Sequence, residues 1–255
     1  MTIQRARVVL IETHSPGNLG AIARVMRNFG LRDMVLVAPR ADPADPAALQ
    51  MARSAAPVLA EARVVPDFSS AVADCVLVVG TSARVGSLVR QQNAGLPETI
   101  LPLAAEVVRA GFPAALVFGP EPTGLSNDVI VRCHHLLHIP TEDECPALNL
   151  AQAVAICAYE LARACRSTAA PPTLEPAHAP ATFELQDQMF DQLRLALEDI
   201  HFLYGEKAHA LMHAIRHLLG KARLTDMEVK VLLGLSRQIR WHAARQSDSL
   251  GEAID

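Results

Sequence analysis

Four segments that combine glycine, proline and polar residues each follow a short apolar run. They are residues 12–24 (ETHSPGNLGAIAR), 80–84 (GTSAR), 118–127 (FGPEPTGLSN) and 139–151 (IPTEDECPALNLA). Glycine allows tight turns and close approach of a ligand to the backbone, while amide, carboxyl and guanidinium groups supply hydrogen bonds. Open α/β sheets bind ligands beyond the carboxyl ends of their strands. The pattern therefore predicts one binding site built from four loops.

The first segment contains the side chain best suited to a phosphate. Arg24 lies six residues after Asn18, inside a predicted helix for which Asn18 is the predicted N-cap. A guanidinium at this place can hold a phosphate or orient a ribose. It can equally be an exposed helix arginine that pairs with a carboxylate.

Two common nucleotide-binding motifs are missing from the sequence. No G-x-G-x-x-G follows the first predicted strand, and no G-x-x-x-x-G-K-[ST] occurs in the chain. This excludes the usual dinucleotide and P-loop enzymes. The formal net charge is −4, so any contact with nucleic acid must rely on local groups of arginine and lysine.

The elements that position these loops alternate between strand and helix. Continuous apolar runs predict fully buried parallel strands at residues 7–11, 34–37, 62–65, 76–79, 114–118 and 136–139. Helices are predicted at residues 19–29, 47–52, 126–133 and 148–164. This order is typical of a doubly wound α/β domain, and the 51% of hydrophobic residues suffices for its core.

The helix at 148–164 carries small residues on one side. Leu148, Ala151, Ala155, Ala158 and Ala162 permit close packing, either in the core of the same chain or against a second subunit. The residues alone favour the core of the same chain.

The composition changes after this helix. Residues 167–183 are rich in proline and alanine and predict a linker between a domain at 1–166 and a helical extension at 184–255. Three apolar series at helical spacing, beginning at Phe190, Leu211 and Val229, predict three helices. They are too few for a comfortable core of their own, so we expect them to pack on the domain or on its twin in a dimer.

Cysteine and histidine give no strong sign of metal. The five cysteines have no C-x-x-C spacing and read as reduced thiols of a cytoplasmic protein. His209, His213 and His217 climb one helix face and converge poorly on an ion, so we expect no metal. The sequence shows no secretory signal and no apolar stretch near the ~18 residues that span a bilayer, so we expect no membrane contact.

The order of the motifs carries a resemblance. N-x-G-x-x-x-R followed by M-R-N-F-G, then F-G-x-E-x-x-G-L, then I-P…L-N-L-A-x-A-V, resembles the SPOUT superfamily of RNA methyltransferases, TrmH family, over residues 6–165. The helical tail around 214–234 is similar to the C-terminal extension of the TrmJ-type tRNA (cytidine/uridine-2′-O)-methyltransferases of that family.

The resemblance implies a deep trefoil knot, a homodimer with active sites formed across it, and the 148–164 helix in the interface. It also implies a bent S-adenosylmethionine bound in the knot. The cofactor residues would be Thr81, Ser82, Ala83, Gly119, Ile139, Pro146, Ala147, Leu148 and Asn149.

The implied reaction is methyl transfer to a ribose 2′-OH at position 32 of the tRNA anticodon loop. Arg24 would be the catalytic arginine, with Asn18 and Glu121 shaping the pocket. RNA would be held by Arg24, Arg84, Arg216, Lys221 and Arg223. Two alternatives stay open: an rRNA 2′-O-methyltransferase, or an RNA-binding protein of this fold without catalysis.

This sequence departs from the family pattern at two places. Pro120 and Pro122 flank the glutamate near which an arginine is common, and Ala147 stands where a hydroxyl residue is common. Both departures bear on the exact RNA target and on how the ribose is held.

Overall fold

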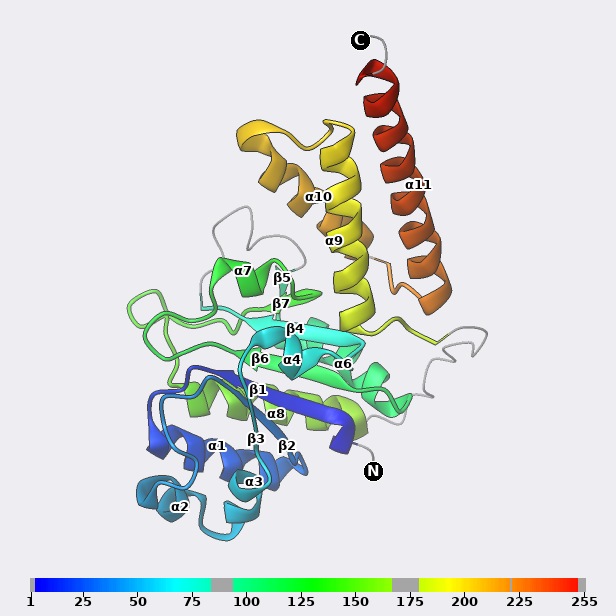
Figure 1. The fold of residues 1–255 in the computed structure, drawn as a ribbon. Helices are drawn as coiled ribbons and strands as arrows, with labels where there is room; N and C mark the ends of the chain where they lie inside the picture. Colours follow the sequence, from blue (N-terminus) through cyan, green and yellow to red (C-terminus); the bar gives the residue numbers. More distant parts are fainter. Residues whose placement is uncertain (1–2, 84–93, 167–178, 221, 252–255) are drawn as a thin grey trace. The chain divides into compact units, whose positions relative to one another are not determined.

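The chain divides into two compact units, residues 1–174 and 175–255 (Figure 1). The computed structural model describes residues 3–83, 94–166, 179–220 and 222–251. Most of the predicted linker, residues 167–178, lies outside the described residues, and the predicted domain bounds therefore stay a prediction.

The first unit is built on a seven-stranded sheet in the order β3-β2-β1-β6-β4-β7-β5, with every neighbouring pair parallel. Its strands are β1 (Ala6–Ile11), β2 (Asp33–Val37), β3 (Arg63–Val65), β4 (Leu77–Thr81), β5 (Ala94–Gly95), β6 (Ala114–Phe118) and β7 (His135–Leu137). The predicted α/β class with a parallel sheet is confirmed.

Buried alternate residues explain how the sheet is covered. Val8 and Leu10 of β1 and Leu116 and Phe118 of β6 join one buried cluster with residues of several helices. Residues two apart share a face of a strand, so these side chains mark the face that the helices cover. The prediction of a fully buried strand at 62–65 is wrong: β3 pairs only with β2, and Val64 is 59% exposed.

The helices of this unit follow most strands. They are α1 (Pro16–Phe29), α2 (Pro46–Ala52), α3 (Ala56–Ala60), α4 (Phe68–Val72), α6 (Pro97–Arg109), α7 (Asn127–Ile130) and α8 (Leu150–Arg166), with 3-10 turns η1 (Ile3–Arg5) and η2 (Arg53–Ala55). The buried cluster on that face of the sheet contains residues of α1, α6 and α8, together with residues of α2 and α3, which pack on α1 (Figure 1).

Two of the small residues of α8 pack inside this chain. Ala158 and Ala162 are buried in the same cluster as β1 and β6, as the residues alone favoured. Ala155 is half-buried and Tyr159 is exposed, so this part of the helix is available to another molecule.

The start of α1 corrects one prediction. Ser15, not Asn18, is the N-cap: its hydroxyl accepts a hydrogen bond from the Asn18 N–H at 3.3 Å, and Pro16 is the first helical residue. Asn18 lies in the first turn, and its side chain is therefore available for another contact. The predicted helix at 126–133 is shorter, but Ser126 does cap it.

The second unit is helical. Its elements are α9 (Phe183–Asp199), η3 (Gly205–Lys207), α10 (Ala208–Gly220) and α11 (Asp226–Gly251). Its small core joins Ala181, Met189, Phe190, Leu224 and Val229. Thr225 and Glu228 begin α11 with reciprocal hydrogen bonds between side chain and backbone, a capping box.

Candidate active site

A pocket of about 180 Å³ lies beyond the carboxyl ends of β4, β6 and β7. All the predicted cofactor residues except Asn149 line it: Thr81, Ser82, Ala83, Gly119, Ile139, Pro146, Ala147 and Leu148. Glu121 lines it as well, together with apolar side chains that were not predicted, such as Phe118, Leu125 and Leu150. Three loops far apart in the sequence thus form one cavity.

Glycine is required where β6 enters the pocket. A Cβ on Gly119 would lie 2.3 Å from backbone atoms of both Gly124 and Leu125. The turn between them is held by the N–H of Gly124, which donates to the Pro120 carbonyl at 2.9 Å. Gly124 itself has a φ of 68°, which L side chains rarely adopt. The sequence F-G-P-E-P-T-G therefore encodes a tight turn that presents bare backbone to the cavity.

Hydrogen bonds join the opposite walls. The Thr81 hydroxyl donates to the Val117 carbonyl at 3.0 Å, and the Ser82 N–H donates to the Leu137 carbonyl at 3.0 Å. The ring of His138 contacts the Ser82 carbonyl through Nδ1 at 3.1 Å. These bonds hold the ends of β4, β6 and β7 in fixed register around the cavity.

The fourth loop closes on itself. The Thr141 hydroxyl donates to the Pro146 carbonyl at 3.0 Å, across the exposed acidic residues 142–144. Pro146, Ala147 and Leu148 are thereby presented to the pocket before α8 begins.

A chain of polar side chains links three of the predicted motifs. Asn18 Nδ2 donates to the Glu121 carboxylate at 2.8 Å, and Asn149 Nδ2 donates to Asn18 Oδ1 at 3.1 Å. The backbone N–H groups of His14 and Ser15 also donate to Glu121, at 3.2 and 3.4 Å. The carboxylate thus lies at the amino end of α1, where a helix favours negative charge.

These contacts determine the ionisation of Glu121. Partial burial opposes its ionisation, but the hydrogen bonds from Asn18, His14 and Ser15 outweigh burial and lower the pKa of the carboxyl below its ordinary value. Glu121 is therefore a carboxylate at neutral pH and acts as an acceptor, not as a proton donor. Sequence reasoning named Asn18, Glu121 and Asn149 but not these bonds, and it missed the backbone donors of His14 and Ser15, for which the sequence has no local signal.

Arg24 is placed apart from this network. It lies on the exposed side of α1 and is not among the residues that line the pocket. Among the described residues it has no hydrogen-bond or ion-pair partner. Its guanidinium is available to a molecule outside this chain.

The other predicted RNA contacts fall in different settings. Arg84 and Lys221 lie outside the described residues, and Arg223 is exposed. Arg216 is only 19% exposed, forms an ion pair with Asp187 at 3.1 Å, and lies 4.3 Å over the Phe190 ring. Arg216 therefore has a structural partner within the second unit.

The described residues contain no group of three or more His, Cys, Asp or Glu side chains that could hold a metal ion. No helix in the described ranges is both long and apolar enough to cross a membrane. All five cysteines are free, and burial raises the pKa of the Cys133 and Cys157 thiols to about 12.

Two family descriptions match the chain in succession. Residues 5–159 match the SpoU rRNA Methylase family, and residues 184–249 match "tRNA methyltransferase TrmJ, C-terminal domain".

Full-length relatives match both parts together. The tRNA (cytidine/uridine/adenosine-2′-O-)-methyltransferase TrmJ of Pseudomonas aeruginosa (strain UCBPP-PA14) is 35% identical and covers 91% of this chain and 93% of its own length. The tRNA (cytidine/uridine-2′-O-)-methyltransferase TrmJ of Klebsiella pneumoniae is 36% identical, with 93% and 97% covered. The crystal structure of TrmJ from Z. mobilis ZM4 superposes with a TM-score of 0.76 at 30% identity, over 92% of this chain and 98% of that one.

The motif loops around one pocket and the match over residues 5–159 lead to the same conclusion: this chain belongs to the SpoU rRNA methylase family.

Proposed function

We propose that this chain transfers the methyl group of S-adenosylmethionine to a ribose 2′-OH of tRNA, at the cytidine or uridine in position 32 of the anticodon loop. The observation that carries the proposal is the convergence of the predicted cofactor residues on one pocket beside the Glu121–Asn18–Asn149 chain. The choice of tRNA is supported by the names of the full-length relatives and by the C-terminal match at 184–249.

The pocket suits S-adenosylmethionine. Bare backbone at Gly119 allows close approach, and Ile139, Leu125 and Leu148 provide apolar walls for an adenine ring. The Glu121 carboxylate at the pocket would supply a negative charge favourable to a sulfonium cation. When bound, the cofactor supplies an electrophilic methyl group.

The chain's own residues then have a positioning task. A ribose 2′-OH is a poor nucleophile, so it must be held in line with the methyl group and helped to lose its proton. Arg24 would hold the neighbouring phosphate and thereby orient the hydroxyl, because arginine, with a pKa above about 12, is a poor base. Asn18, held by Glu121, and Asn149, which donates to Asn18, would keep the rim of the pocket in shape.

We infer that the active unit is a homodimer with a trefoil knot in each protomer. Residues 119–125 and 146–148 line one pocket before α8 returns to pack with α1 and α6, a path that fits a knot in this half of the domain. Arg24 lies outside the pocket of its own chain, which fits a site completed by the Arg24 of a second copy.

The same comparisons support the proposed domain bounds. The matches at 5–159 and 184–249 support a methyltransferase domain at 1–166, a linker at 167–183 and a helical extension at 184–255. We place the enzyme in the cytoplasm with its tRNA substrate.

The test is transfer of a labelled methyl group to bulk tRNA and, separately, to rRNA, followed by mapping of the modified nucleotide. We expect a 2′-O-methyl group at tRNA position 32. Label on rRNA alone would assign an rRNA enzyme, as the family description suggests. Absence of cofactor binding by calorimetry would assign an RNA-binding protein without catalysis.

The role of Arg24 is tested by Arg24→Ala beside Arg53→Ala, another exposed arginine of this unit. We expect Arg24→Ala to lose most of the methyl transfer, with cofactor affinity within about twofold of the wild type, while Arg53→Ala keeps both. A parallel loss of cofactor binding in Arg24→Ala would make Arg24 structural.

A further inference from the structure

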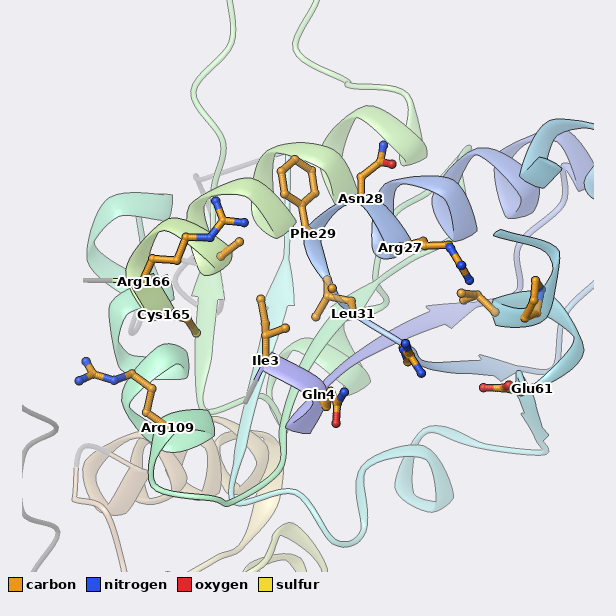
Figure 2. A pocket seen from close by; sticks show the side chains of 15 residues that line it. Ile3, Gln4, Arg27, Asn28, Phe29, Leu31, Glu61, Arg109, Cys165 and Arg166 are labelled. Carbon is orange, nitrogen blue, oxygen red and sulfur yellow. The ribbon is translucent and has the colours of Figure 1, made fainter. Parts of the chain in front are cut away.

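A second and larger hollow lies in the first unit, at the end of the sheet opposite the active-site pocket. Its volume is about 710 Å³, and Figure 2 shows the side chains around it. It is formed by η1 before β1, by the last turns of α1, α6 and α8, and by α3 with Glu61 after it. Because β1 runs away from this end, the hollow lies at the amino end of the sheet, and the proposed active site at the carboxyl end.

Positive charge gathers around this hollow. Arg27, Arg32, Arg109 and Arg166 line it, against a single carboxylate, Glu61. The amides of Gln4 and Asn28 add hydrogen-bond donors, while Ile3, Phe29 and Leu31 give apolar surface (Figure 2). In a chain whose formal net charge is −4, this is a local reversal of sign.

Some arginines of the first unit are held in ion pairs, and three of those at the hollow are not. Arg7 pairs with Asp33 and Asp74, Arg40 with Glu12, Arg63 with Asp33, and Arg163 with Glu160. Arg27, Arg32 and Arg166 are exposed and have no hydrogen-bond or ion-pair partner among the described residues.

Helix ends explain only part of this group. Arg27 and Arg166 lie in the last turns of α1 and α8, where a positive charge is favourable by roughly 0.3–1 kcal/mol. Arg32 follows the end of α1 and precedes β2, so it belongs to neither helix. The favourable interaction with a helix end therefore does not explain why Arg32 lies at the same hollow.

The surface of α1 connects the hollow with Arg24. Arg24, Arg27 and Asn28 stand at i, i+3 and i+4, so they are neighbours on one side of the helix, and all three are exposed. The 14 residues of α1 span about 21 Å, too far for a small molecule in the active-site pocket to reach. A nucleic acid backbone held at Arg24 can follow this line of donors to the hollow.

We propose that the hollow of Arg27, Arg32 and Arg166 is a phosphate-binding subsite for the RNA substrate, reached along α1 from Arg24. The guanidinium fork matches phosphate geometry, and unpaired exposed arginines require no ion pair to be broken on binding. The identity of the ligand as substrate RNA rests on the proposed function. The binding of phosphate at this place does not.

The experiment measures tRNA affinity as a function of salt for the full-length protein. Each arginine that neutralises a phosphate contributes ~0.7–0.9 to the log–log slope, so the triple variant Arg27→Gln, Arg32→Gln, Arg166→Gln should reduce the slope by about 2. We expect affinity at ~0.1 M salt to fall by roughly tenfold or more. The triple variant Arg27→Lys, Arg32→Lys, Arg166→Lys keeps the charge and should keep most of the slope.

The matched control is Arg53→Gln, Arg63→Gln, Arg163→Gln, which removes the same charge from exposed positions of the same unit. It should leave the slope within about 0.5 of the wild type. An equal loss in this control would show a general charge effect and overturn the subsite. An unchanged slope in the first variant, with a native melting temperature, would overturn it as well.

Two further measurements distinguish RNA from other molecules that could bind in the hollow. If inorganic phosphate or cytidine monophosphate bound the wild type as tightly as tRNA and lost that binding in the glutamine variant, the hollow would be a small-ligand site and the RNA assignment would fail. A change of sedimentation in the variant with an unchanged salt slope would assign the hollow to a second copy of the chain.

Methyl transfer by the wild type, assayed separately, tests the proposed function. Transfer by the wild type together with an unchanged salt slope in the glutamine variant rejects only the subsite. A reduced slope in the variant without any transfer by the wild type rejects only the function.

Discussion

At the scale of single residues, the site depends on which asparagine does which task. Asn18 was the predicted N-cap, but the backbone of Ser15 is the extended one that an N-cap requires, with Pro16 following it. Asn18 is therefore free to bridge Glu121 and Asn149. The residue types could be predicted from the sequence. The bonds could not, because they join positions more than 100 residues apart.

Glu121→Gln tests the carboxylate through the pH dependence of stability. Its pKa is lowered in the fold, so its ionised form contributes stability above the unfolded pKa of about 4.3, and this is lost as pH falls through the folded value. We expect Glu121→Gln to unfold about 1 kcal/mol more easily in urea at pH 7, with a smaller difference at pH 3. Glu144→Gln, in the exposed acidic loop, should show neither effect. Equal losses at both pH values would contradict a role for the charge.

Gly119→Ala tests the close turn in the pocket. The new Cβ would lie 2.3 Å from backbone of Gly124 and Leu125, so the loop must move. We expect a loss of about 1–3 kcal/mol in the free energy of unfolding and at least tenfold weaker cofactor binding by calorimetry. Gly124→Ala is the control: its Cβ meets nothing within 4 Å, and only the positive φ costs about 1 kcal/mol. Cofactor affinity that falls equally in both variants would mean that crowding at Gly119 is not the cause.

At the scale of elements, apolar runs predicted the buried strands well and the exposed or interrupted elements poorly. The run at 62–65 predicted a buried strand, but β3 lies at an edge because no strand follows it in the sheet. The helix α6 was missed, since it begins at Pro97 and contains Pro102, which removes a helical N–H. Its burial of Leu101, Ala104 and Val108 outweighs that cost. The position of β6 between β1 and β4 depends on tertiary packing, for which the local sequence gives no signal.

The element α8 supplies a paired prediction about assembly. Ala155 is half-buried and Tyr159 is 53% exposed, whereas Ala158 is buried in the core of its own chain. We expect Ala155→Arg to yield folded monomers with no methyl transfer, because charge placed in an apolar dimer interface is costly. Ala158→Arg should instead lower the melting temperature by at least several degrees, because it places an arginine in the core.

Sedimentation and thermal melting measure both outcomes, with Arg163→Ala as a control at an exposed position of the same helix. An Ala155→Arg protein that is monomeric and fully active would reject the dimeric active site. A dimeric and active Ala155→Arg protein would move the interface away from this part of α8.

At the scale of the whole molecule, some arginines are paired inside the protein and others are exposed to solvent. Arg216 forms an ion pair with Asp187 and lies over the Phe190 ring inside the second unit. The prediction that Arg216 contacts RNA did not include these partners. Charge counting along a sequence cannot separate such an arginine from an exposed one, because the partner comes from another helix. Arg216→Gln should therefore destabilise the second unit, and a loss of RNA affinity in that variant would be ambiguous.

The contribution of the tail to RNA binding is better tested at Lys221 and Arg223. We expect the double variant Lys221→Gln, Arg223→Gln to weaken tRNA binding and to lower the log–log salt slope by up to about 1.4–1.8. Cofactor binding should be unchanged, because every residue that lines the active-site pocket precedes α9. Arg194→Gln, whose guanidinium pairs with Glu198 on the same helix, is the matched control and should retain the wild-type slope. A double variant with the wild-type affinity and slope, and an unchanged melting temperature, would show that these two positions do not contact tRNA and that the second unit serves packing alone.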